Sequence, residues 1–220
     1  MVLANGALAQ AAAAASEPKP VLPQIALPPV PTGPPPATSQ LDAYLFLPKS
    51  PLASPAGVLP KESRTPAQLQ ALLSNYVGTW RGAARWYSNA TGHLLQAPAE
   101  MVYTLKVENG RKVLACTITY SLPAGPSVAL SRTWVESGHI FSEITQGDSS
   151  QRFIAQSTPE GLIWRTFDSM SAVLEFSEVE TLRLTPDGGE LSSSGYEVQH
   201  YARGDSLVFE SADLTLVKPN

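Results

Sequence analysis

The sequence after Gly78 alternates strand-like segments with short turn signals, and this alternation constrains the fold more than any other feature. The predicted strands are residues 79–87, 100–107, 112–120, 127–135, 139–146, 150–157, 161–167, 173–184, 190–201 and 206–217. The connections carry turn pairs such as Asn-Gly, Ser-Gly and Asp-Gly, and none is long enough for the helical crossover that joins parallel strands. Neighbouring strands should therefore be antiparallel.

About ten antiparallel strands in one small domain leave two unpaired edges unless the sheet closes on itself. Closure removes both edges, so we predict an all-β fold: an up-and-down antiparallel barrel of about ten strands. A two-sheet sandwich is the alternative. The barrel requires that the first strand, 79–87, pairs with the last strand, 206–217, around a hollow lumen.

A short helix is predicted just before the first strand. Thr65 can cap it, Pro66 suits the first helical position, and Gln68 can complete a capping box. The apolar residues that follow recur at helical spacing and predict one buried stripe: Leu69, Leu72, Leu73 and Tyr76.

Proline is concentrated before this domain, since fourteen of the 20 prolines lie in residues 1–66. Each proline removes a backbone donor and fixes φ, so we predict that residues 16–64 form a disordered proline-rich linker to a barrel domain at 65–220. Residues 1–15 contain Ala7-Leu8-Ala9, the small-x-small form that a signal peptidase accepts. We interpret them as the remnant of a signal peptide, which would make the protein secreted or periplasmic; a low-complexity alanine tail is the alternative.

Composition excludes several classes of partner and site. The chain has 15 basic and 19 acidic residues, a net charge of −4, and no basic run, which argues against nucleic acid as a partner. No stretch approaches the ~18 consecutive apolar residues of a membrane-spanning helix. Cys116 is the one cysteine, so the chain can form no internal disulfide and no CxxC metal site.

Two turns set the register of their hairpins. Asn109-Gly110 is a strong two-residue hairpin signal, and it predicts three pairs on one apolar face: Leu105 with Leu114, Tyr103 with Cys116, and Met101 with Ile118. Cys116 is therefore expected to be a small buried side chain. Ser137-Gly138, interpreted in the same way, predicts four further pairs: Leu130 with Thr145, Arg132 with Glu143, Trp134 with Phe141, and Val135 with Ile140.

The second hairpin gathers Arg132, Trp134, Phe141 and Glu143 on one face. A charge pair beside two aromatic side chains is a candidate anchor inside a cavity, where Arg132 could contact a ligand carboxylate in a bidentate manner. The alternative is a cross-strand salt bridge on the surface, with the aromatic rings lying on the sheet.

Tryptophans supply the other candidate ligand contacts. Trp80 and Trp86 share a face of the first strand with the small residues Gly82 and Ala84 between them, which leaves room for a ligand. The predicted ligand-binding residues are Trp80, Trp86, Arg132, Trp134, Phe141, Glu143 and Trp164. Packing of these tryptophans in a filled core is the alternative.

We predict no catalytic residue and no metal site. The sequence contains no nucleophile elbow, P-loop or dinucleotide fingerprint, and its three histidines lack ligand spacing. Glu178 and Glu180 share a face with Phe176 and Leu182 if their strand is regular, and we interpret both glutamates as solvated.

The string Val77-Gly78-Thr79-Trp80-Arg81-Gly82, which follows the short helix, resembles the start of calycin barrels, the group that contains lipocalins and fatty-acid-binding proteins. It is more specifically similar to the nitrobindin-like heme-binding β-barrels, as are the segments 131–134, 138–143 and 155–162. The resemblance covers residues 66–217. It implies a barrel whose tryptophan closes one end and whose interior holds a ligand.

The heme of that family does not transfer directly, because the axial histidine expected on the last strand is missing from residues 206–217 and Phe141 stands in place of the distal histidine. Heme iron needs a donor such as His, Cys, Met or Tyr, and His200 is the alternative donor. We therefore predict no cofactor and a barrel that binds a small apolar or amphipathic molecule, a binding role that leaves enzymatic activity an open alternative. The alternatives are a heme-dependent isomerase or detoxifying enzyme, and an envelope scaffold that uses the proline-rich lead or residues 41–47.

Overall fold

The computed structural model describes residues 59–89, 92, 94–168, 173–201 and 204–217. The expectations for residues 1–15 and for most of the linker at 16–64 lie outside the described residues. One helix, α3 (Pro66–Ser74), precedes the strands in this part of the chain. None of the helices in the described residues has the length and apolar character needed to cross a membrane.

Ten strands follow α3 in the described residues, and each overlaps one of the ten predicted segments. Their bounds are β1 (Gly78–Ser88), β2 (Leu94–Glu108), β3 (Arg111–Leu122), β4 (Gly125–Glu136), β5 (His139–Gln146), β6 (Ser149–Ser157), β7 (Gly161–Asp168), β8 (Val173–Thr185), β9 (Gly188–Tyr201) and β10 (Gly204–Leu216).

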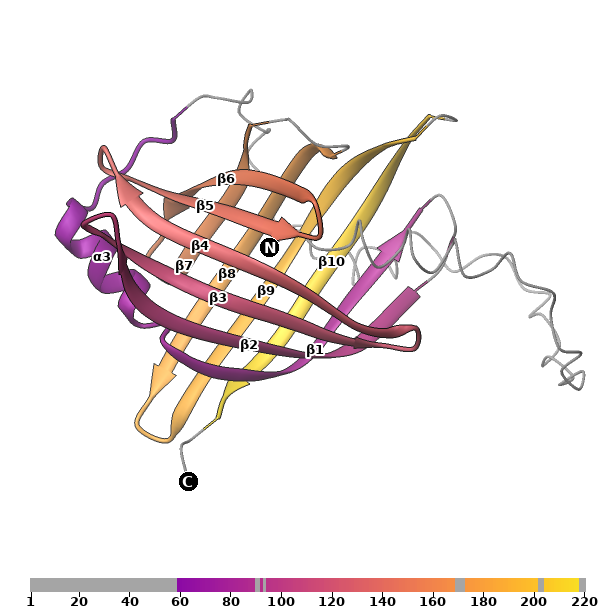
Figure 1. Cartoon of the computed structure of the whole chain (residues 1–220), viewed down its shortest axis with the longest axis horizontal. Helices are drawn as coiled ribbons and strands as arrows, with labels where there is room; N and C mark the ends of the chain where they lie inside the picture. Colours follow the sequence, from indigo (N-terminus) through magenta and orange to yellow (C-terminus); the bar gives the residue numbers. More distant parts are fainter. Residues whose placement is uncertain (1–58, 90–91, 93, 169–172, 202–203, 218–220) are drawn as a thin grey trace, which may run out of the picture.

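The strands form a closed antiparallel barrel in which each one pairs with its neighbours in sequence (Figure 1). The barrel closes where β1 meets β10, from the pair Trp80 and Leu216 to the pair Ser88 and Val208. Closure leaves no unpaired edge along this seam. The prediction of an up-and-down barrel is therefore confirmed, and the sandwich alternative is wrong.

Both hairpin registers are confirmed. The structure pairs Tyr103 with Cys116 across β2 and β3, and Arg132 with Glu143 across β4 and β5. The turn residues Asn109 and Ser137 have φ values of 52° and 51°, and the glycine after each also has a positive φ. Two consecutive residues in the left-handed region are typical of the type I′ turn, whose twist matches that of the flanking strands.

Strand β2 begins at Leu94, six residues before the predicted start at 100. The predicted segment leaves out Pro98, a residue that cannot donate to a sheet ladder. In the structure Pro98 pairs with Ala83 of β1, whereas pairing with β3 begins only at Ala99. Strand β2 therefore accommodates proline at a position that pairs with β1 but not with β3.

Helix α3 lies at one end of the barrel, next to β4 and β5 (Figure 1). The predicted capping box is present: the Thr65 side chain accepts from the Gln68 backbone at 3.3 Å, and the Gln68 side chain accepts from the Thr65 backbone at 2.8 Å. The chain then runs into Trp80, which is fully buried and whose Nε1 donates to the Tyr76 carbonyl oxygen at 2.8 Å. The helix end and Trp80 together fill this end of the barrel core.

The seam between β1 and β10 depends on Gly82. A Cβ at this position would lie 1.9 Å from the Asp213 carbonyl oxygen of β10, a distance that backbone atoms cannot accommodate without moving. The close approach of the two strands therefore requires glycine at position 82.

Residues just before the helix are attached to the barrel wall. The Glu62 carboxylate accepts from the Ser157 backbone at 3.0 Å and from the Ser157 hydroxyl at 2.6 Å. Arg64 donates to the Thr158 carbonyl oxygen at 2.7 Å. These bonds position the approach to α3 against the end of β6.

Candidate functional site

The barrel lumen is lined by alternate residues of each strand, because successive side chains point to opposite faces of a sheet. Trp80 and Trp86 of β1 face inward, and so do Tyr103 of β2 and Cys116 of β3. Because Ser131 of β4 pairs with Cys116 of β3, its side chain points to the same luminal face. The lumen is consequently apolar along β1 to β3 and richer in hydroxyl groups along β4.

Four glutamates are buried on the luminal strands β8, β9 and β10. Among the described residues they are the only buried charged side chains: Glu178, Glu180, Glu197 and Glu210. The interpretation of Glu178 and Glu180 as solvated is wrong, since they are 2% and 6% exposed. The strand is regular from Phe176 onward, so both carboxylates share the inward face with Phe176 and Leu182.

A small cavity lies in the lumen between the end covered by α3 and the middle of the barrel, with a volume of about 30 Å³. Aromatic rings and one carboxylate line one part of it, and hydroxyl groups line another. The lining residues are Leu73, Tyr76, Tyr103, Leu114, Ile118, Ser131, Thr133, Ser142, Ile144, Phe153, Leu162, Trp164 and Glu180.

Glu180 is the ionisable acid of this cavity. The Trp164 indole Nε1 donates to its Oε1 at 3.4 Å. Burial and the charge of the Glu178 carboxylate together raise the pKa of Glu180 to about 7, although hydrogen bonding by the neighbouring Tyr76 hydroxyl and Trp164 N–H opposes the rise. A carboxyl group with this pKa changes its charge near neutral pH.

The Tyr76 hydroxyl is buried beside Glu180 and makes no hydrogen bond of good geometry within the described residues. Burial, together with the Glu180 carboxylate, raises the pKa of Tyr76 well above its usual value, so the phenol stays protonated. A buried polar atom without a partner is uncommon in folded proteins and points to a missing one. Tyr76 therefore offers the cavity an acceptor oxygen, while its O–H lies beside the Glu180 carboxylate.

Three hydroxyl groups from β4 and β5 form another part of the cavity wall. The Thr133 Oγ1 donates to the Ser142 Oγ at 2.9 Å, and the Ser131 and Ser142 hydroxyls lie 3.2 Å apart. All three side chains are buried. Their mutual hydrogen bonds offset part of the cost of placing hydroxyl groups in an apolar lumen.

Glu210 of β10 is a second buried carboxyl group in the lumen, close enough to Glu178 of β8 and Glu197 of β9 for their charges to affect it. Burial raises the pKa of Glu210 well above its usual value, and the carboxylates of Glu178 and Glu197 add to the rise, while a hydrogen bond from Trp86 lowers it. The Oε1 of Glu210 has no hydrogen-bond partner within the described residues. The Trp86 ring also contacts Tyr120 edge to face, with centroids 4.8 Å apart.

Gly195 of β9 separates two of these carboxylates. In the register it lies between Glu178 of β8 and Glu210 of β10. A Cβ at Gly195 would lie 2.3 Å from the Ser177 carbonyl oxygen and 2.7 Å from the Glu178 Cα. Glycine therefore allows β8 and β9 to approach closely where the acidic side chains enter the lumen.

The structure brings three of the seven predicted ligand-binding residues into the lumen. Trp80 fills the end below α3, Trp164 lines the cavity beside Glu180, and Trp86 lies next to Glu210. Their ligand contacts stay a prediction.

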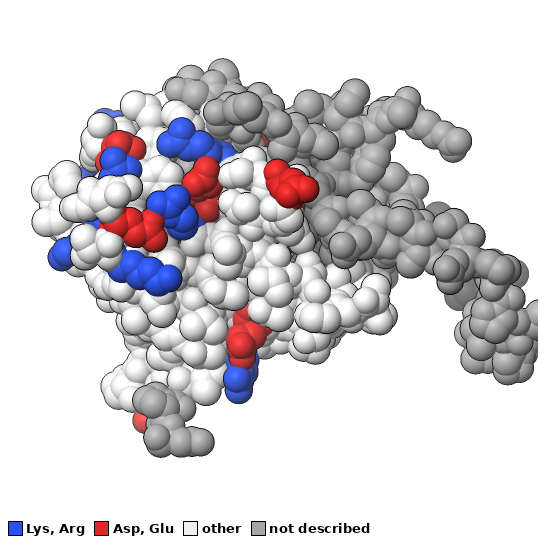
Figure 2. Space-filling view, in the orientation of Figure 1, with Lys and Arg blue, Asp and Glu red and all other residues white. Residues whose placement is uncertain are grey.

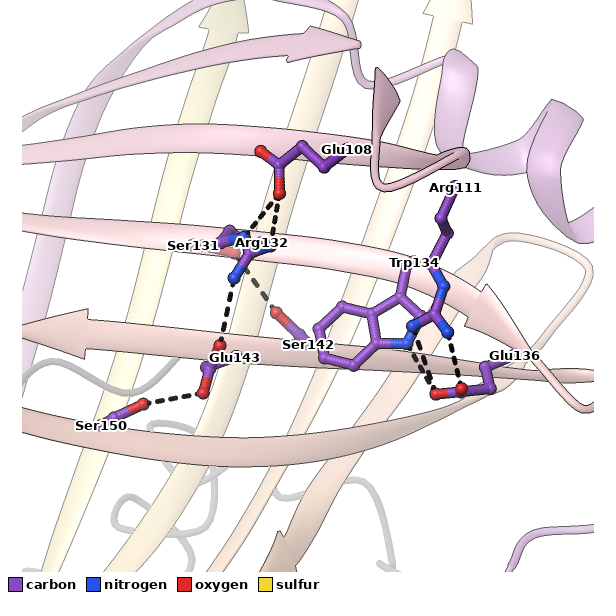
Figure 3. A network of polar contacts seen from close by, with 9 residues as sticks. All are labelled: Glu108, Arg111, Ser131, Arg132, Trp134, Glu136, Ser142, Glu143 and Ser150. Atoms are coloured by element: carbon purple, nitrogen blue, oxygen red, sulfur yellow. Dashed lines mark hydrogen bonds and ion pairs between the residues drawn. The ribbon is translucent and has the colours of Figure 1, made fainter. Parts of the chain in front are cut away.

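The other four, Arg132, Trp134, Phe141 and Glu143, lie on the outer face of β4 and β5, as Figure 3 shows for all but Phe141. Arg132 forms ion pairs with Glu108 and, at 3.6 Å, with Glu143. This geometry matches the surface salt-bridge alternative, and it separates these residues from the luminal cavity. In the same orientation as Figure 1, Figure 2 shows acidic and basic side chains interspersed on the outer surface.

The outer aromatic pair is packed by its neighbours. Trp134 and Phe141 stack with centroids 6.1 Å apart, and Arg111 and Arg152 lie 5.7 Å and 5.6 Å from the centre of the Trp134 ring. The Trp134 Nε1 donates to Glu136 at 3.0 Å (Figure 3). Ring and cation contacts of this kind stabilise an outer sheet surface without a ligand.

Cysteine and histidine positions give no metal or nucleophile site in the described part of the chain. Cys116 is buried, as expected, and burial raises the pKa of its thiol. No group of three or more His, Cys, Asp or Glu residues is placed to hold a metal ion among the described residues. His139 lies at the start of β5, while the side chains of His93 and His200 lie outside the described residues.

Sequence reasoning missed two sets of buried residues: the hydroxyl-bearing Ser131, Thr133 and Ser142, and the glutamates that line the lumen. Both had signals in the chain. Glu180 alternates with Phe176 and Leu182, and a register for the hairpin between β3 and β4 would have placed Ser131 beside Cys116. Neither signal shows that the groups meet, because β4 and β8 are not neighbours in the barrel.

Comparison with solved structures finds a similar barrel in the S-type phycobiliprotein lyase CPES from Guillardia theta. The TM-score is 0.50 at 8% sequence identity, and the match covers 69% of this chain and 94% of that one. No protein-family model matches the chain, and no curated protein shows significant sequence similarity to it. The likeness shows the fold alone, and with the closed topology it supports a calycin-like barrel.

Proposed function

We propose that this protein binds a small amphipathic or apolar molecule in the lumen of its barrel. One observation carries the proposal: the lumen holds a cavity in which a buried carboxylate, aromatic rings and hydroxyl groups converge. Binding sites for small molecules are mostly apolar and contain a few polar groups placed to orient the ligand. The cavity has this composition.

The buried glutamates support a binding role over a purely structural one. Moving an ionised carboxylate out of water costs several kcal/mol unless it is paired, so a core selected only for stability would avoid it. Groups whose pKa is strongly perturbed by burial and by like charges gather at functional sites. Glu180 and Glu210 are both in this condition.

The solved barrel that this chain resembles is named as a phycobiliprotein lyase. At 8% identity we take from it only the support that a calycin-like barrel gives to ligand binding. A relation to the nitrobindin-like barrels, based on the string around Trp80, is part of the proposal. Export of the protein, based on residues 1–15, is part of it as well.

A second candidate function, a non-catalytic scaffold with a filled barrel, is favoured by the size of the cavity. Pockets for drug-sized ligands usually measure about 300–1,000 Å³. The luminal cavity, at about 30 Å³, accommodates only part of such a ligand unless side chains move. Uptake of a ligand therefore separates the two functions.

Native mass spectrometry of the full chain purified from its own host is the first experiment, because a ligand that co-purifies would be weighed directly. Hemin is added in a parallel titration, where a Soret band would favour the heme-dependent alternative. A co-purified small molecule supports the proposal. Protein that emerges ligand-free and takes up no apolar fluorophore contradicts it and favours the scaffold.

A variant that fills the cavity provides the matched test. In Ser131→Leu the larger side chain enters the cavity, while Ser142 keeps its hydrogen bond from Thr133. We expect fluorophore binding to weaken about tenfold or more, since overpacking excludes the ligand. Thr117→Leu makes a similar change at an exposed position on neighbouring β3 and should leave binding unchanged. Equal binding by both variants would place the ligand outside this cavity.

A further inference from the structure

The negative charge of the cavity bears on the class of ligand that it takes, and the inference drawn from this charge rests on the proposed function. Glu180 is the charged side chain in the cavity lining, and the described lining contains no lysine, arginine or histidine. We propose that the cavity takes the primary ammonium group of an amphipathic amine, with the Glu180 carboxylate as its counter-ion.

Aromatic rings surround this carboxylate. Tyr76, Tyr103 and Trp164 line the same cavity, and the rings of Tyr76 and Tyr103 lie 5.8 Å apart at a tilt of 55°. The face of an aromatic ring attracts a cation, and the attraction grows when water is excluded. A carboxylate among aromatic rings therefore suits an ammonium group and disfavours an anionic ligand.

The hydrogen-bonding capacity of the cavity also fits an ammonium group. Such a group carries three N–H donors and no acceptor, so it needs oxygen atoms around it. The Glu180 carboxylate provides acceptors, and the Tyr76 hydroxyl, which is 2% exposed as a residue, has an oxygen without a hydrogen-bond partner in the described structure. The Tyr76 hydroxyl lies beside Glu180, so the two groups face the same part of the cavity.

Cavity size restricts the kind of ammonium group. A water molecule occupies about 10–15 Å³ by the measure used for such cavities, so a volume of about 30 Å³ holds about two groups of that size. A primary ammonium group is close to water in size, whereas a quaternary one is much larger. The alkyl chain of the amine needs further room, which side chains would have to provide by moving, and Ile118 and Ile144 are apolar residues of the lining that it would contact.

Other titratable groups near Glu180 keep the cavity negative or neutral. Glu178 raises the pKa of Glu180 through its charge. Burial raises the pKa of Tyr103 and Cys116, so both face the cavity region as neutral groups near pH 7. Arg64 is the nearby cation, and its guanidinium donates to the Thr158 carbonyl oxygen at the barrel end.

The test compares three ligands that share one alkyl chain: octylamine, octanol and octanoate. Each is titrated at pH 8 into the full-length protein, and binding is measured by displacement of a neutral fluorophore. We expect octylamine to bind about tenfold or more tightly than octanol, as one charge-assisted hydrogen bond provides, and octanoate to bind more weakly than octanol.

The variant Glu180→Gln should reduce octylamine binding to the level of octanol and leave octanol binding unchanged. Glu160→Gln is the matched control, because it removes one negative charge at an exposed position and should keep the preference for the amine. Octanoate binding as tightly as octylamine, or a preference for the amine that persists in Glu180→Gln, would overturn the inference and leave the proposed function standing. Failure of all three ligands to bind the wild-type protein would overturn the inference, and the proposed function would fall with it only if native mass spectrometry also finds the protein ligand-free.

Discussion

Replacing Glu180 with glutamine tests the energetic consequence of a carboxyl group buried in the lumen. Glutamine has nearly the same shape as the protonated acid, and its side-chain oxygen can still accept from the Trp164 indole N–H. The substitution therefore removes the ionisation of residue 180 and little else. We expect its effect on the free energy of unfolding to depend strongly on pH.

The magnitude follows from the pKa of Glu180, which burial raises from 4.5 to about 7. This rise corresponds to about 3 kcal/mol of preference for the protonated form in the folded protein. Because the folded state binds the proton more tightly, the contribution is fully present below pH 4.5 and is lost as the pH rises through 7. The variant should match the wild type near pH 4.5 and exceed its stability by as much as about 3 kcal/mol at pH 8.

Urea denaturation at a series of pH values between 4.5 and 8 measures this difference, and thermal melting should show a gain of roughly 6–12 °C at pH 8 for a domain of this size. Glu160→Gln is the control for the loss of one negative charge at an exposed site. A stability difference between Glu180→Gln and wild type that is the same at both ends of the pH range would refute the reasoning, as would a variant less stable than wild type at pH 8.

Three further substitutions test the packing, each by urea denaturation of the purified protein. Trp80→Ala should cost about 3–5 kcal/mol, because a fully buried indole leaves a cavity below α3; a loss under about 1 kcal/mol would show that Trp80 does not close the barrel end. Gly82→Ala should cost about 1–3 kcal/mol, because its Cβ would lie 1.9 Å from the Asp213 carbonyl oxygen; unchanged stability would contradict the tight seam. Arg132→Ala should change stability by less than about 1 kcal/mol and leave ligand binding intact, because its ion pairs with Glu108 and Glu143 lie on the outer surface and are partly exposed; loss of binding would restore Arg132 to the site.

Local sequence signals predicted the strands and turns well. The pairs around Asn109 and Ser137 have the predicted partners, since a two-residue turn fixes both the register and the alternation of its strands. The capping box at Thr65 is present for the same reason, because all its hydrogen bonds fall within four residues. These features depend on contacts between residues that are close in sequence.

The candidate site was predicted less well, because alternation shows which residues share a face but not which face turns inward. In β4 the face with Leu130 and Trp134 is the more apolar one, yet the structure turns Ser131 and Thr133 into the lumen. The pairing of Ser131 with Cys116 decides this, since Cys116 already belongs to the apolar face of β3. The order of the strands thus overrides the hydrophobicity of a single strand.

The sequence by itself determined the ten strands, the antiparallel pairing, the helix cap and the residues that share each face, because turn chemistry and side-chain alternation are local properties. Closure of the barrel, where β1 pairs with β10, decided which side chains meet in the lumen. It brought Glu180 of β8 into one cavity with Tyr103 of β2 and Ser142 of β5, residues that no local pattern connects. The physical reason is that a barrel makes distant strands face one another across its lumen, and only the closed sheet defines which side chains meet there.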